Sequence, residues 1–197
     1  EQIMQPSLKE LFFTPMPIMV EGIEDVAYIL TYIELMKLSD EFRNHECQFI
    51  MTGGKTNMSR PLAITKAFNI NSFIIFDGDT DETKEETANK KDNTCLLKLS
   101  GFNEVDPLSK SNTFEKCFTM WATNIRKEVI SEIKNEEWEK AINKVKDENG
   151  WQGVGGKNCL LIAATLEELW NNNIKSTQLE TTCNNIIKYA KDIKNDE

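Results

Sequence analysis

The chain has 197 residues, of which 40% are hydrophobic and 28% charged, and its formal net charge is -9. This length suits one substantial domain or a domain with an appendage, and no apolar run is long enough to span a membrane. The acidic balance argues against a general nucleic-acid coat, which would be basic. It does not exclude a metal-dependent enzyme acting on nucleic acid, because bound cations reverse the local charge. Since the first residues resemble no signal peptide and lack an initiator Met, we expect a processed protein or a piece of a longer one.

Cysteine and histidine usage excludes several kinds of site. The cysteines are odd in number and form no C-x-x-C pair, so we expect the reduced, mostly buried thiols of a cytoplasmic protein. The single histidine, His45, is expected in a solvated loop before a strand. A histidine-rich metal site and a Ser-His-Asp triad are therefore not expected.

The first part of the chain alternates strand and helix patterns. In chain order we expect a strand at 18–21, a helix at 23–38, a strand at 47–51 and a helix from Ser59 to about Phe68. A strand at 73–77, a charged helix at 82–91, a strand at 94–99 and an edge strand at 117–121 follow. This alternation predicts a parallel sheet with right-handed crossovers.

The second part is helical from about Asn124. Apolar stripes at helical spacing predict two helices, a glycine-rich break at 149–156, a helix at 157–170, and a last helix opened by a Thr177–Glu180 capping box. We expect an α/β core at 1–122 and a helical subdomain at 123–197 that carries Lys157. The four tryptophans are expected to serve mainly in core or interdomain packing.

Two apolar strands end abruptly on carboxylates and glycine: Glu21-Gly22 after the first, and Asp77-Gly78-Asp79 after the third. Buried parallel strands bind ligands at their carboxyl ends, so we expect Glu21, Asp25, Asp77 and Asp79 to lie together. Asp25 follows Glu21 by one helical turn, so both can face the same side. Asp77 and Asp79 are two residues apart, so on extended backbone they would also face the same side. Such oxygen ligands suit magnesium. A simpler interpretation of Glu21 and Asp25 is a pair that stabilises a helix dipole, with Glu24 facing solvent.

The segment from Asp77 to Asp81 has another interpretation. It fails as an EF-hand, because Glu82 and Ala88 occupy the positions of the required Gly and Glu. It also resembles the start of the haloacid-dehalogenase phosphatase fold, with Asp77 as nucleophile and Asp79 as acid/base. That motif usually has Thr or Val where Asp81 stands, and it lies at the front of its domain.

Taken together, the strand ends resemble the Toprim domain, whose signature is a glutamate after the first strand and D-x-D after the third. The stretch 20–26, which begins Val-Glu-Gly, resembles OLD-family nucleases (overcoming lysogenization defect) more narrowly. The loop Gly53-Gly54-Lys55-Thr56-Asn57 and the helix opening Gly155-Gly156-Lys157-Asn158 are similar to that family too. The resemblance implies a Rossmann-like parallel sheet flanked by helices, followed by a helical subdomain. In that family an ABC-type ATPase region precedes the Toprim domain, and nothing in this chain resembles it.

The same resemblance implies a Mg²⁺- or Mn²⁺-dependent DNA endonuclease that uses two metal ions. Glu21, Asp25 and Asp77 would hold one ion, Asp79 would help to hold the second, and Lys157 would stabilise charge on the scissile phosphate. The catalytic residues would then be Glu21, Asp77, Asp79 and Lys157. DNA is the expected partner, a homo-oligomer is a possible form, and no membrane association is expected.

One departure from the family pattern concerns the second metal ion. The family usually supplies another acid from a W-x-x-D-x-E-like stretch, where this chain has Asn124 and Arg126 after Trp121. Glu115 or Glu128 could substitute. The missing acid also leaves open a weakly active Toprim module with a regulatory role. Five further cations have two interpretations: they could form a basic strip along a DNA path, or simply a solvated helix face. They are Lys110, Lys116, Arg126, Lys127 and Lys134.

Overall fold

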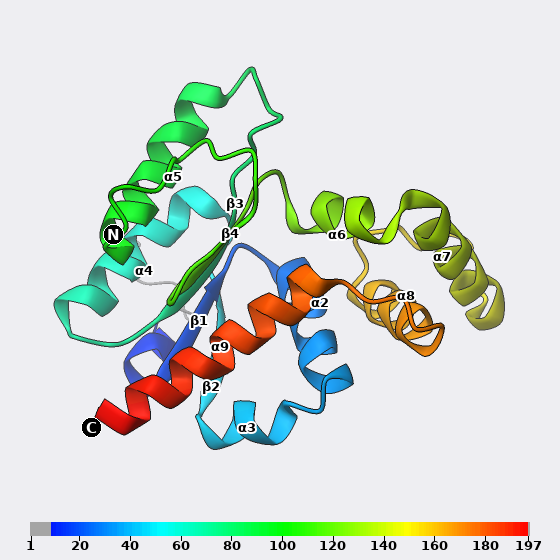
Figure 1. The fold of residues 1–197 in the computed structure, drawn as a ribbon, viewed down its shortest axis with the longest axis horizontal. Coiled ribbons are helices and arrows are strands. Elements are labelled where there is room, and N and C mark those ends of the chain that lie inside the picture. The colour runs from blue at the N-terminus through cyan, green and yellow to red at the C-terminus, as the bar shows by residue number, and fades with distance from the viewer. Residues whose placement is uncertain (1–8, 197) are drawn as a thin grey trace.

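The computed structural model describes residues 9–196 and builds them around one mixed sheet (Figure 1). The sheet order is β2-β1-β3-β5-β4, in which β4 alone runs antiparallel to its neighbour. The strands are β1 (Met16–Val20), β2 (Cys47–Met51), β3 (Phe73–Asp77), β4 (Thr113–Phe114) and β5 (Phe118–Trp121). Both acidic strand ends therefore lie on neighbouring parallel strands, at the same edge of the sheet.

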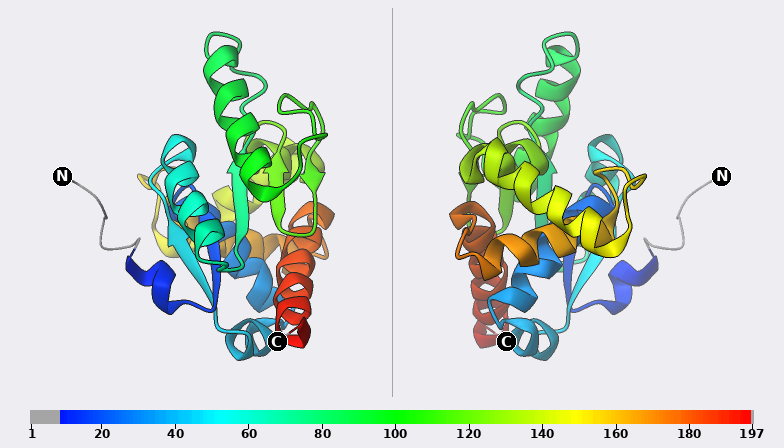
Figure 2. Two further views of the ribbon diagram at one scale, coloured as in Figure 1. Left: turned by 90° about the vertical axis from the view of Figure 1, so that its left-hand side faces the viewer. Right: turned by 90° about the vertical axis from the view of Figure 1, so that its right-hand side faces the viewer.

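Helices cover both faces of the sheet, and the later ones extend beyond it (Figures 1 and 2). In chain order they are η1 (Glu10–Phe13, a 3-10 helix), α2 (Ile23–Leu35), α3 (Ser39–Asn44), α4 (Lys55–Ala67), α5 (Glu86–Ser100), α6 (Ile125–Ile133), α7 (Asn135–Asn149), α8 (Cys159–Asn171) and α9 (Thr177–Asp196). The α/β class with a mainly parallel sheet, flanked by helices and followed by helices, is confirmed. Within the described part of the chain, no helix has both the length and the apolarity needed to cross a membrane.

Strand alternation divides the apolar side chains between two cores. Ile18, Val20 and Ile75 face the core shared with α2, α6, α7, α8 and α9. Met19 and Ile74 face the other core, with α4 and α5. Because β1 and β3 are buried on both faces, their sequences are continuous apolar runs and not alternating ones.

The predicted strand at 94–99 is wrong, because these residues belong to α5. Asn89, Asn93, Leu96 and Leu97 are its buried positions, and this spacing is helical. The short apolar run looked strand-like by itself, but the polar residues before it complete one face of a helix. That face packs against α4.

Other element boundaries also differ from the prediction. The helix expected from Ser59 begins at Lys55, so Pro61 lies within α4. The helix expected to continue to residue 38 ends at Leu35, and the short α3 was not predicted. The strand expected at the sheet edge, β5, is internal, because the unpredicted two-residue β4 pairs outside it.

The helical region packs much as its apolar stripes predict. The stripes of α6, α7 and α9 are buried in the core that also covers the sheet. Ser176 and not Thr177 caps α9, since its Oγ accepts from Leu179 N at 3.2 Å. Trp121 and Trp138 are fully buried, which confirms their packing role. The division at residue 122 falls between β5 and α6, and we keep it as a proposed domain boundary.

Candidate metal centre

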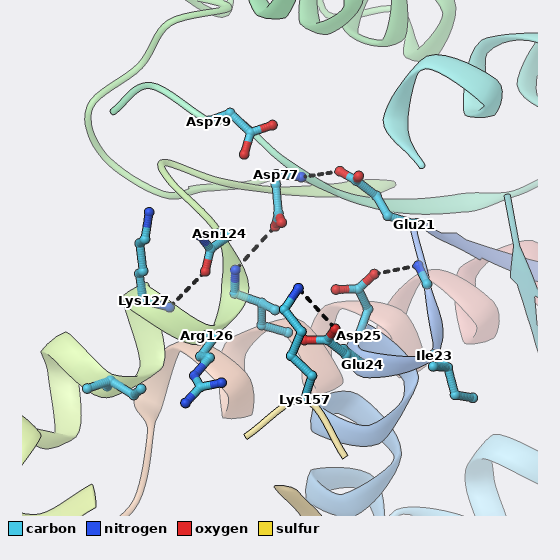
Figure 3. Close-up of a pocket in the computed structure, with 13 residues that line it drawn as sticks. Glu21, Ile23, Glu24, Asp25, Asp77, Asp79, Asn124, Arg126, Lys127 and Lys157 are labelled. Atoms are coloured by element: carbon cyan, nitrogen blue, oxygen red, sulfur yellow. Dashed lines mark hydrogen bonds and ion pairs between the residues drawn. The ribbon is translucent and has the colours of Figure 1, made fainter. Parts of the chain in front are cut away.

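The acidic strand ends open into a pocket of about 630 Å³ at the carboxyl edge of the sheet (Figure 3). All the residues predicted to form the site line it: Glu21, Asp25, Asp77, Asp79 and Lys157. Glu24, Asn124, Arg126 and Lys127 are among its other lining residues. Residues from β1, α2, β3, α6 and the loop before α8 thus meet at one place.

Glu21 is held between two structural elements by its carboxylate. Its Oε1 accepts from Asp77 N at 2.8 Å, and its Oε2 accepts from Lys55 N at 3.0 Å. The first bond fixes the end of β1 to the end of β3, and the second ties it to the first residue of α4. The glutamate is therefore positioned by backbone donors before any ligand arrives.

The Gly53-Gly54 turn makes the contact with α4 possible. The two glycines have φ of +74° and +115°, in the region that disfavours other residues. Gly53 N and Gly54 N both donate to Glu21 O, at 3.0 and 3.1 Å. The loop after β2 thus wraps the backbone of Glu21, which explains its two glycines.

Asp25 has a local partner as well as a place in the pocket. Its Oδ2 accepts from Gly22 N at 2.8 Å, at the start of α2, so the helix-terminus interpretation of this residue is also correct. Asp25 is buried, although it still lines the pocket. Gly22, which lies between β1 and α2, is extended, with φ of -155° and ψ of -174°.

Gly78 is the glycine that the site requires. A Cβ there would lie 2.6 Å from Trp121 O and 2.8 Å from Ala122 O, which are backbone atoms of the neighbouring strand end. Gly78 N also donates to Trp121 O at 2.7 Å. The end of β3 therefore lies directly on the residues that lead from β5 into α6.

Asp77 and Asp79 both line the pocket, but not through the extended backbone that was assumed. Asp79 has φ of +52°, a left-handed conformation that Asp tolerates better than most residues. Asp77 Oδ1 accepts from Ile125 N at 3.2 Å, at the start of α6. Asp79 Oδ2 accepts from Lys55 Nζ at 2.6 Å.

Burial and crowding raise the pKa values of three of these carboxyl groups. Desolvation, opposed by the hydrogen bond from Asp77 N, raises the pKa of Glu21 to about 7, and the Asp25 charge adds to the rise. Desolvation also raises the pKa of Asp25 to about 6. Burial, with the charges of Glu21, Asp25 and Asp79, raises the pKa of Asp77 well above its ordinary value. Ionising these three carboxyl groups together is therefore costly without a nearby cation.

Cationic side chains line the other side of the pocket. Lys157 Nζ lies 3.4 Å from Glu24 Oε1, and its side chain is 81% exposed. Glu24 was expected to face solvent, but it lines the pocket instead. The Arg126 guanidinium lies against Gly156, where a Cβ would approach it to 2.6 Å. Arg126 is therefore placed beside the loop that carries Lys157.

Neither glutamate suggested for a second metal ion lines the pocket. Glu128 Oε1 accepts from Thr123 N at 3.1 Å and Thr123 Oγ1 at 2.6 Å, so it closes the turn into α6. Glu115 lines a different pocket, with Lys116. Asn124, where an acid was expected, caps α6 by accepting from Lys127 N at 3.0 Å. His45 lies at the end of α3 and does not line the pocket either.

The fit to a divalent cation rests on the type of donor. Among the described residues, no three acidic, histidine or cysteine side chains already lie close enough together to hold a metal ion. The available donors are carboxylate oxygens, which are the ligands preferred by Mg²⁺ and Mn²⁺. Burial raises the pKa values of Glu21, Asp25 and Asp77, and a bound cation would offset this rise because it favours the ionised forms. The donor types at this site therefore fit such an ion.

Residues 12–79 match the family model described as "Overcoming lysogenization defect protein-like, TOPRIM domain". This segment is similar to the OLD-like Toprim domain. It includes Glu21, Asp25, Asp77 and Asp79, and its limits run from η1 to the turn after β3. The sequence search of curated proteins gives no match to the chain.

Solved structures extend the likeness of the fold beyond the Toprim domain. The C-terminal region of the Xanthomonas campestris pv. campestris OLD protein, phased with iodine, is 12% identical with a TM-score of 0.59. That comparison covers 94% of this chain and 100% of the other. The same region phased with platinum is 13% identical, with a TM-score of 0.57, over 95% and 100% of the two chains. At this identity the likeness concerns the fold, and it includes the helices that follow the sheet.

Proposed function

We propose that this chain is a nuclease domain that hydrolyses DNA phosphodiester bonds with a bound Mg²⁺ or Mn²⁺ ion. The observation that carries the proposal is the pocket itself. Glu21, Asp25 and Asp77 meet on one side of it, while Arg126 and Lys157 line another part. A phosphodiester needs both a cation held by carboxylates and positive side chains for its own oxygens.

The residues have distinct roles in this proposal. Glu21, Asp25 and Asp77 would hold the metal ion, whose chemistry is to activate water and to neutralise charge on the phosphate. Lys157 would bind a non-bridging oxygen of the scissile phosphate and stabilise the charge that develops on it. Arg126 lies beside the same loop and would orient the phosphate with its planar guanidinium. The Lys157 side chain is exposed and pairs with Glu24, and it would leave this carboxylate when DNA binds.

The structure favours this proposal over a phosphatase of the haloacid-dehalogenase type. In that fold D-x-D lies at the front of the domain, whereas Asp77 ends the third strand of this chain. The match to a Toprim domain over 12–79 favours the nuclease for the same residues. A Toprim module with only a regulatory role would keep the fold and fail to cut, so cleavage itself distinguishes it.

We also propose that the domain works as part of a larger assembly in the cytoplasm. Both solved structures are C-terminal regions of an OLD protein. By the family resemblance, the further region would be an ABC-type ATPase. A homo-oligomer is a second proposed level of assembly.

Supercoiled plasmid tests the proposed reaction. Incubated with Mn²⁺ or Mg²⁺, the chain is expected to nick or linearise it, and EDTA is expected to stop the cleavage. Lys157→Ala is expected to slow cleavage about 100-fold, as loss of one charge-stabilising donor does in other enzymes. Lys140→Ala is the matched control, because Lys140 is an exposed lysine that pairs with Glu137 away from the pocket.

Three outcomes would contradict the proposal. Cleavage that persists in EDTA would exclude the metal. Equal rates for Lys157→Ala and Lys140→Ala would remove Lys157 from the reaction. Absence of cleavage by the folded, metal-loaded chain would favour the regulatory module.

A further inference from the structure

Lys55 is a buried cation inside the acidic site. Its side chain is only 6% exposed, and its Nζ donates to Asp79 Oδ2 at 2.6 Å and to Asp77 O at 2.8 Å. Its backbone N–H donates to Glu21 Oε2 at 3.0 Å. Lys55 is thus attached at both ends to the residues that form the site, and a buried ammonium persists only with such partners.

The lysine and arginine partners are unevenly divided among the carboxylates. Asp79 pairs with Lys55, Glu24 with Lys157 at 3.4 Å, and Asp81 with Lys127 at 2.7 Å. In the described part of the chain, no lysine or arginine lies within ion-pair distance of Glu21, Asp25 or Asp77. The Glu21, Asp25 and Asp77 carboxylates therefore have no lysine or arginine partner among the described residues, whereas Asp79 already has one in Lys55.

The side chains considered for a second metal ion are engaged elsewhere. Asn124 caps α6, and Glu128 is bound to Thr123 and to Asn112. A second metal ion beside Asp79 would have to displace the Lys55 ammonium from Asp79 Oδ2 and from the Asp77 carbonyl oxygen. A single ammonium satisfies the same position with a carboxylate and a backbone carbonyl.

We propose that Lys55 takes the place of a second metal ion, so that the site holds one divalent cation among Glu21, Asp25 and Asp77. This inference rests on the proposed function, and it puts a charge built into the chain where the family resemblance implies a second metal ion. The Gly53-Gly54 turn and the start of α4 fix the position of that charge. Asp79 is then a positioning residue that orients Lys55, and not a metal ligand.

Calorimetric titration with Mn²⁺ tests the inference without measuring activity. The wild-type chain is expected to bind one ion, and Asp79→Asn is expected to bind one ion with affinity changed less than about threefold. Lys55→Met is expected to bind two, because Asp79 loses its ammonium partner. The double variant Lys55→Met/Asp79→Asn is expected to return to one.

Lys66→Met is the matched control, because Lys66 lies on the same helix and donates to Leu99 O away from the pocket. It is expected to bind one ion. Two ions in the wild type, or loss of the single ion in Asp79→Asn, would overturn the role of Lys55 and leave the nuclease proposal intact. No binding by the wild type would overturn both. If Lys55→Met does not fold, the wild type and Asp79→Asn still decide the question.

Discussion

Replacing Asp77 with Asn is expected to reduce metal-dependent cleavage at least about 100-fold and to make the metal-free protein more stable at pH 8. Loss of an indirect partner of a metal ligand already costs 10- to 100-fold, so loss of a ligand should cost no less. The amide keeps an oxygen for Ile125 N, which Asp77 Oδ1 accepts at 3.2 Å, so the fold should persist. Cleavage rates and thermal unfolding in EDTA measure the two effects.

The stability gain follows from the sign of the pKa shifts. A carboxyl group whose pKa is raised by folding stabilises the protein below its unfolded pKa, and this contribution is lost as pH rises through the folded pKa. For Glu21 and Asp25 the folded pKa values are about 7 and about 6. Metal-free wild type should therefore lose stability between about pH 4 and pH 7, and Asp77→Asn should lose less.

Asp81→Asn is the matched control for this prediction. Asp81 is close in sequence but pairs with Lys127 and does not line the pocket, and that hydrogen bond lowers its pKa. Its substitution should leave cleavage within about twofold and should not stabilise the protein at pH 8. If Asp77→Asn unfolds at a lower temperature than wild type at pH 8 in EDTA, ionised Asp77 is not destabilising as described.

Gly78→Ala is expected to destabilise the protein by about 1–3 kcal/mol, the usual cost of forcing extra atoms into a packed site. The new Cβ would meet Trp121 O and Ala122 O at 2.6 and 2.8 Å, and both are backbone oxygens that cannot rotate away. The strand ends would separate and displace Asp77 and Asp79, so cleavage should fall as well. Denaturant unfolding measures the stability change.

Gly22→Ala provides the comparison, because a Cβ at Gly22 has no atom within 4 Å and its backbone is extended. Its stability should change by less than about 1 kcal/mol. Equal destabilisation by the two substitutions would mean that the contact between Gly78 and the end of β5 is not what requires glycine there.

The meeting of the acidic strand ends was predictable because it follows from general rules. Buried apolar runs that alternate with helices give parallel strands, and the ends of neighbouring parallel strands meet. The sequence order of Glu21 before Asp77 and Asp79 then predicted the similarity to the Toprim domain that the family model matches over 12–79. The burial of α6, α7 and α9 also followed from their apolar spacing.

The remaining features depended on contacts between distant segments. The run at 94–99 is apolar enough for a strand, and only its packing on α4 shows why it is helical. The position of β5 depended on a two-residue partner, too short to recognise. The sequence places Lys55 in a glycine-rich loop, but its contact with Asp79 joins residues 24 apart. Glu24 was a missed pocket residue whose signal was its place in the first turn of α2, beside Asp25.

Anomalous diffraction from crystals soaked in Mn²⁺ tests the central claim most directly. One peak is expected, within coordination distance of Glu21, Asp25 and Asp77, with Lys55 still bound to Asp79. A folded domain with no peak at this place, although soaked at millimolar Mn²⁺, would contradict the assignment of the pocket as a metal centre.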